Sequence, residues 1–206
     1  MRSGNRGRCA IIERMETVFV VGIGVGLSSV AGIRAYLPLA LVGLFARLGL
    51  FTLSAPFDLL DDWLVVGALL VLALLESGLD KLPALDPVLD TVQTPLRIVA
   101  GAVLFAVALR AGLDVAGIPE LAAGAGIAGL VAVLKVVLRP SAGVSAAGVS
   151  TPFLSFFEDV VAGVGSVVAV LIPFLPLTFV GFLLFFFFRV RRRRGRKYGG
   201  LRILGD

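Results

Sequence analysis

The 206-residue sequence contains no histidine and a single cysteine, Cys9. The lack of histidine excludes histidine-based catalysis and histidine metal ligands, and one thiol forms neither an intrachain disulfide nor a thiolate metal cage. A bound metal ion would be a hard cation on oxygen ligands, with its identity left open. The sequence also lacks a P-loop, a dinucleotide fingerprint, a zincin motif and a nucleophile–base pair. We therefore predict no cofactor and no enzymatic activity.

Charged residues are scarce as well. They make up 16% of the chain, whereas a soluble domain usually has about 25%. Hydrophobic residues make up 58% and the mean hydropathy is +1.02. They occur in blocks, which is typical of several transmembrane helices. The 25 glycines agree with this, because small residues let helices approach closely in lipid. The sequence thus predicts an all-α, polytopic membrane protein with six or seven transmembrane helices.

Apolar segments divide the chain into a basic N-terminal extension (1–16), a single membrane domain (17–190) and a basic tail (191–206). The extension either resembles a signal segment or precedes a true start at Met15. The first apolar segment is rich in glycine and serine, so we expect a weak, broken helix that is either a full span or a re-entrant half-helix. The segments are 17–33, 35–51, 63–79, 95–113, 119–138, 152–172 and 174–190.

Basic residues crowd the end of the chain, directly after four phenylalanines at 185–188. The positive-inside rule places this tail in the cytoplasm beside anionic lipid headgroups, and we favour this over nucleic-acid binding. Counting back puts loops 80–94 and 139–151 inside, and loop 52–62, with three aspartates and no Lys or Arg, outside. We predict a multi-pass protein of the inner (plasma) membrane. Seven spans would leave the basic N-terminus outside, whereas six spans with a re-entrant segment, or a start at Met15, would not.

Two helical hairpins, over about residues 63–113 and 119–172, look related. In each, a helix ends near a proline and a Thr-Pro pair follows at the same spacing. Proline stops a helix, and at the first helical position it starts one with threonine as a candidate N-cap. We predict a repeated hairpin, with chance similarity as the alternative; many transporters build a midplane site from repeats. The matching residues are Pro83 with Pro140, Thr94 with Thr151 and Pro95 with Pro152.

Acidic residues lie in or beside the apolar segments, where an ionisable group is expensive and usually functional. Glu76 and Asp80 are four residues apart and would share one helix face. Two carboxylates at that spacing repel each other unless a proton or a cation lies between them, which suits proton exchange or hard-cation binding. The alternative is a solvated loop or a structural ion pair. The candidate ligands are Glu76, Asp80, Glu158 and Asp159, with Asp86, Asp90 and Thr151 as secondary candidates.

Basic residues near the inner ends of the segments are candidate counter-charges. A buried carboxylate in a membrane normally has a partner, so we expect Glu158 and Asp159 to pair with one or more of these cations. The alternative is that the basic side chains extend to the headgroups. The polar stretch 141–151 either lines a cavity or forms a linker. The candidate counter-charges are Arg34, Lys81, Arg97 and Lys135.

Many of the candidate residues above lie in three sequence motifs, and these motifs resemble those of a prokaryotic integral-membrane family catalogued as domain of unknown function 4126. The resemblance covers about residues 16–190 and implies a multi-span helical architecture without assigning an activity. The family usually has Ser-Asn-Pro in its last motif; Thr151 replaces the asparagine here, so a role for that amide is not carried over. The motifs are Gly32-Ile33-Arg34-Ala35-Tyr36-Leu37-Pro38, Glu76…Asp80-Lys81…Pro83…Asp86…Asp90…Thr94…Arg97…Gly101 and Ser150-Thr151-Pro152…Ser155…Glu158-Asp159.

A looser resemblance concerns residues 76–81, which are similar to the Glu-x-Gly-Asp-Lys motif of a family of cation/proton exchangers, with one extra residue before the aspartate. We predict a small secondary transporter or channel that uses intramembrane carboxylates for proton or cation coupling. A homo-oligomer, most simply a homodimer, would complete such a site. The alternative is a scaffold or complex subunit whose buried charges only lock helix packing. A lipid-active membrane enzyme ranks third.

Overall fold

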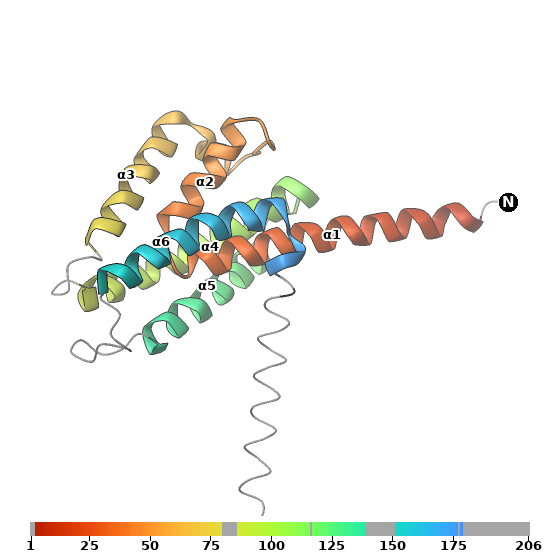
Figure 1. Cartoon of the computed structure of the whole chain (residues 1–206). Helices are drawn as coiled ribbons and strands as arrows, with labels where there is room; N and C mark the ends of the chain where they lie inside the picture. The colour runs from red at the N-terminus through yellow and green to blue at the C-terminus, as the bar shows by residue number, and fades with distance from the viewer. Residues whose placement is uncertain (1–2, 80–85, 116, 139–150, 177, 179–206) are drawn as a thin grey trace, which may run out of the picture.

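The computed structural model describes residues 3–79, 86–115, 117–138, 151–176 and 178 (Figure 1). Over these ranges the regular secondary structure is entirely helical, which confirms the all-α part of the predicted fold class. Loop 52–62 contains a short 3-10 helix, η1. The elements are α1 (Ser3–Ala31), α2 (Tyr36–Arg47), η1 (Asp58–Asp61), α3 (Trp63–Leu79), α4 (Asp86–Leu113), α5 (Ile118–Leu138) and α6 (Thr151–Leu171).

The first apolar segment is part of one continuous helix, so the predicted break within residues 17–33 is wrong. α1 runs through all the glycines up to Ala31, and its N-terminal part extends beyond the other helices (Figure 1). The glycines provide room for neighbouring helices rather than breaking the helix. A Cβ at Gly24 would lie 2.9 Å from the ring of Phe105, and one at Gly26 would lie 2.7 Å from the Cβ of Ala169.

α1 ends in a short link that leads directly into α2. The amides of Ile33 and Arg34 both bond to the carbonyl of Val30, which closes the last turn of α1. Pro38 lies in the first turn of α2, where its missing N–H removes no helical hydrogen bond. Arg34 is therefore held in the link between two helices, and it is 1% exposed.

α4 lies at the centre of the helix bundle. It packs along both α5 and α1, and α1 also packs against α6. The contact between α4 and α5 depends on small residues: a Cβ at Gly101 would collide with Ala128, and one at Gly124 would collide with the carbonyl of Gly101. α2, η1 and α3 form an arm at one side of this bundle, which we call the α2–α3 arm (Figure 1).

Two Thr-Pro pairs were predicted to start helices. The pair Thr151-Pro152 agrees with the structure, whereas Thr94-Pro95 does not. α6 begins at Thr151, so Pro152 lies in its first turn. α4 begins at Asp86, so Pro95 lies inside it. A proline within a helix removes its own amide hydrogen bond, and its ring crowds the carbonyl four residues earlier, yet α4 continues past Pro95. The loops 80–85 and 139–150 lie outside the described residues, and the repeated hairpin stays a prediction.

Several charged side chains lie inside the bundle, and many large apolar side chains lie on its surface. Charged side chains such as Arg34, Glu76 and Arg97 are buried, while leucines such as Leu64 and Leu74 are 79% and 73% exposed. Among the described residues, two helical stretches are long and apolar enough to cross a membrane, and three further apolar helices are shorter. The predicted number of six or seven spans therefore stays a prediction. The two long stretches are Val92–Leu113 and Ile118–Lys135.

Candidate functional site

Charged side chains from the α1–α2 link and from α6 meet at one end of the bundle. Nε of Arg34 lies 2.9 Å from Oδ1 of Asp159, and its Nη2 lies 4.0 Å from Oε2 of Glu158. Nη2 also donates a hydrogen bond of 3.0 Å to the hydroxyl of Ser155. One guanidinium therefore contacts three side chains of the second and third turns of α6.

Lys135 brings α5 into the same group of charges. Its Nζ lies 2.8 Å from Oε2 of Glu158 and donates a hydrogen bond of 3.3 Å to the carbonyl of Ile33. This carbonyl follows the end of α1, where backbone oxygens lack helical partners. Lys135 thus joins α5 both to α6 and to the α1–α2 link. Glu158 in turn has two cations within 4.0 Å, Lys135 and Arg34.

α3 reaches this group through the residues of its last turn. The hydroxyl of Ser77 donates a hydrogen bond of 2.9 Å to Oδ1 of Asp159. The adjacent residue, Glu76, places Oε1 3.8 Å from Nη2 of Arg97 on α4. Arg97 also donates to Oε1 of Gln93, one turn earlier on α4, at 2.6 Å. Neighbouring residues of α3 therefore bind two different helices.

Six of the side chains in these contacts are charged, and we call them together the ion-pair cluster. It contains three cations and three carboxylates, and each has an opposite charge within 4.0 Å. Such mutual pairing is required, because removing one partner of a buried pair leaves an uncompensated charge and typically costs about 3–5 kcal/mol. The ion-pair cluster comprises Arg34, Glu76, Arg97, Lys135, Glu158 and Asp159.

The cluster has an accessible side made of carboxylates. The side chains of Glu158 and Asp159 are 13% and 20% exposed, whereas those of Arg34 and Lys135 are 1% and 7% exposed. The pair of Glu76 and Arg97 is almost completely enclosed. An ion that approaches the cluster from this side therefore meets negative groups first.

The structure brings together most of the predicted site residues within the described chain. Glu158 and Asp159 contact Arg34 and Lys135, while Arg97 contacts Glu76 instead of the α6 carboxylates. α3 ends at Leu79, so the predicted shared face of Glu76 and Asp80 falls outside the described part, as does Lys81. The side chains of the remaining candidates are likewise outside it: Asp86 and Asp90, near the start of α4, and Thr151, at the start of α6.

The sequence-based prediction of the site missed three polar residues: Ser77, Gln93 and Ser155. Each had a sequence signal. Ser77 directly follows Glu76, Gln93 precedes Arg97 by one helical turn, and Ser155 precedes Asp159 by one turn. Residues four apart on a helix lie on the same face, so a search for polar neighbours at this spacing would have found two of the three.

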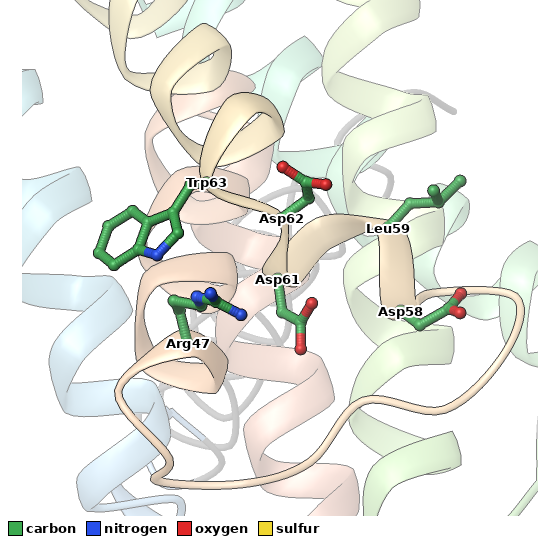
Figure 2. A pocket seen from close by; sticks show the side chains of 6 residues that line it. All are labelled: Arg47, Asp58, Leu59, Asp61, Asp62 and Trp63. Atoms are coloured by element: carbon green, nitrogen blue, oxygen red, sulfur yellow. The ribbon is translucent and has the colours of Figure 1, made fainter.

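An open pocket of about 330 Å³ lies at the other end of α3 (Figure 2). The guanidinium of Arg47 lies 5.4 Å from the ring centroid of Trp63, and Oδ1 of Asp62 accepts a hydrogen bond from the amide of Leu64, capping α3. Trp63 and Glu76 are about 20 Å apart along α3 at the rise of an α-helix, so this pocket is separate from the ion-pair cluster. It is lined by Arg47, Asp58, Leu59, Asp61, Asp62 and Trp63.

Comparison with known proteins supports the resemblance seen in the sequence. The model of the family described as Domain of unknown function (DUF4126) matches residues 21–193. This range includes α2 to α6, most of the apolar part of α1 and every residue of the ion-pair cluster. No curated protein and no solved structure matches the chain significantly. The chain therefore belongs to the family Domain of unknown function (DUF4126).

Proposed function

We propose that this chain is a multi-pass membrane protein that acts as a small secondary transporter or channel, with the ion-pair cluster as its proton- or cation-coupling site. One observation carries the proposal. A charge-balanced cluster from the α1–α2 link and four helices lies inside a bundle whose outer surface is largely apolar. A lipid environment accounts for this arrangement, because ionisable groups in membranes face the interior of the bundle and pair with one another.

The exposure of the carboxylates favours protons or cations over anions as the coupling species. Glu158 and Asp159 lie on the accessible side, and Arg34 and Lys135 lie beneath them. An anion would first meet two negative groups, whereas a proton or cation would be attracted to them. Binding there would weaken the pairing across the cluster and thereby change how tightly α6 is held to its neighbours.

A scaffold or complex subunit is the second candidate, and the completeness of the pairing favours it. Each of the six charges has an opposite charge within 4.0 Å, so the cluster can act purely as a lock between helices. This role would require no change in protonation and no access from water. Neutralising a carboxylate would then alter stability or assembly and nothing else.

Ion flux in proteoliposomes tests the proposal. Purified protein is reconstituted with a pH-sensitive dye inside, and gradients of H⁺, Na⁺, K⁺, Mg²⁺, Ca²⁺ and Mn²⁺ are applied. We expect wild-type protein to move a proton or cation, and Glu158→Gln to lose this flux while remaining monodisperse. Glu120→Gln, at the start of α5 and outside the cluster, is the matched control and should retain it.

The absence of flux under every gradient would reject the transport proposal and favour the scaffold. In that case Glu158→Gln should lower the thermal stability or change the oligomeric state of the protein.

A further inference from the structure

α5 and α6 both pack along α1, but within the described residues they hardly pack on each other. They meet at the end of the bundle that holds the ion-pair cluster, where Nζ of Lys135 lies 2.8 Å from Oε2 of Glu158. Toward the other end of α1, Val18 is 45% exposed. The two helices therefore leave apolar side chains uncovered on either side of α1.

On α5, an apolar face lies next to the contact with α1 and away from α4. Val131 contacts α1 at Gly32, and Leu130 and Leu134 flank Val131 on this side. These two leucines are 65% and 46% exposed. Residues three or four apart share a helix face, so the face continues along the helix. We call it the α5 stripe: Ala123, Ile127, Leu130 and Leu134.

α6 has an apolar face of the same kind. A Cβ at Gly165 would lie 3.0 Å from Val30 of α1, and Gly163 lies near Leu37 of the α2–α3 arm. The face beside the α1 contact and away from the arm carries side chains that are 36% to 58% exposed at Val161, Val164 and Ile172. We call it the α6 stripe: Val161, Val164, Val168 and Ile172.

The chain that follows α6 is already seated on α1 where the described part ends. The ring of Phe174 packs edge-on against Phe19, with the centroids 4.4 Å apart. A Cβ at Gly26 would lie 2.7 Å from Pro176. In Figure 1 the blue end of the described chain lies beside α1. The residues after Pro176 therefore start from the side of α1, next to the two stripes.

The sequence that follows has the composition and length to cover both stripes. Residues 179–188 are all Phe, Leu, Val or Gly, and as a helix they would be about 15 Å long, close to the roughly 16 Å from Ala123 to Leu134. The basic residues 191–194 come next. A helix running back along α1 would bring them to the end where Lys135 lies, the side that the positive-inside rule assigns to the tail. The family match extends to residue 193, so this segment belongs to the family domain.

We propose that residues 179–188 form a further helix that packs over α1 between the α5 stripe and the α6 stripe. A segment of the same chain is favoured over a second copy, because Phe174 and Pro176 already hold its start beside α1 and tethering raises the effective concentration. Close van der Waals packing drives such association in lipid. The helix would also separate the pair of Lys135 and Glu158 from lipid.

This inference rests on the membrane placement in the proposed function and is independent of ion coupling. Disulfide cross-linking in native membranes tests it. Cys9 is replaced by serine, Leu134→Cys is introduced in α5, and a second cysteine is placed in turn at each of positions 182–188. After oxidation we expect disulfides within one chain at positions three or four residues apart. Ala123→Cys should instead pair with the earlier positions 179–182, because the helix runs toward the cluster.

Val133→Cys is the matched control. Val133 is 57% exposed and adjacent to Leu134, but it points about 100° away around α5, on the side turned away from α6. It should form no disulfide with any scanned position. Equal yields from Val133→Cys and Leu134→Cys would show random collisions and overturn the inference.

Two other results would also overturn it. Disulfides between two chains in place of those within one chain, seen as dimers on a non-reducing gel, would show that a second copy covers the stripes. No disulfide from Leu134→Cys or Ala123→Cys, in protein whose cysteines all react with a maleimide, would show that lipid covers them. Neither result depends on flux. Cross-links without flux would support the packing and reject transport, and flux without cross-links would do the reverse.

Discussion

Arg34 and Asp159 lie 2.9 Å apart, from Nε to Oδ1, so the link between α1 and α2 is bound directly to α6. The same guanidinium reaches Ser155 and Glu158 on that helix. A residue outside any helix thus holds one end of the bundle together. The consequences of this arrangement can be measured through stability as well as through activity.

Arg34→Ala should destabilise the protein strongly. The substitution leaves the carboxylate of Asp159 without its cation and Ser155 without its donor, and breaking a buried pair costs about 3–5 kcal/mol. Thermal unfolding in detergent measures the loss. Arg110→Ala is the control: Arg110 pairs with Asp114 within one exposed segment, and such pairs contribute about 1 kcal/mol or less. Equal effects of the two substitutions would contradict a structural role for the buried pair.

Glu76 and Arg97 should be energetically coupled. Either Glu76→Gln or Arg97→Gln alone removes one charge of an enclosed ion pair, whereas the double variant removes both. We expect each single change to cost about 3–5 kcal/mol and the double change to cost clearly less than their sum. A double-mutant cycle on unfolding measures the coupling. Additive effects would show that the 3.8 Å separation does not reflect a pair that matters for stability.

Two glycines of α5 should respond oppositely to alanine. Gly124→Ala would place a Cβ against the carbonyl of Gly101, and overpacking typically costs about 1–3 kcal/mol. Gly126 has no atom within 4 Å of the added Cβ, so Gly126→Ala should be neutral or stabilise α5 by up to about 1 kcal/mol. Parallel thermal melts make the comparison. Similar losses at both positions would contradict the close packing of α4 and α5.

The basic tail should be in the cytoplasm if the chain is oriented by its positive charges. A reporter enzyme that is active only outside the cytoplasm should be inactive when fused after Asp206 and active when inserted in loop 52–62. The physical reason is that Lys and Arg are retained on the cytoplasmic side, and that loop carries none. Activity of the fusion after Asp206 would reverse the proposed orientation.

Most helix boundaries could be predicted because they depend on local composition. The apolar segments 63–79 and 119–138 correspond closely to α3 and α5, since a run of apolar residues flanked by Asp or Pro is visible along the chain. α1 and α4 were predicted less well. The glycine-rich stretch of α1 packs closely against Phe105 of α4 and Ala169 of α6 and stays helical. α4 continues through Pro95, although local signals favoured a break in the first case and a helix start in the second.

The sequence by itself determined the all-helical class, the family and the presence of charges within apolar segments. It also indicated that Glu158 and Asp159 need cationic partners, because an unpaired charge is too costly in an apolar interior. Only the tertiary structure decided that Arg34 and Lys135 provide them and that Arg97 binds Glu76 instead. Ion pairs form over a few ångströms, and that proximity depends on how the helices are rotated and shifted against one another by packing.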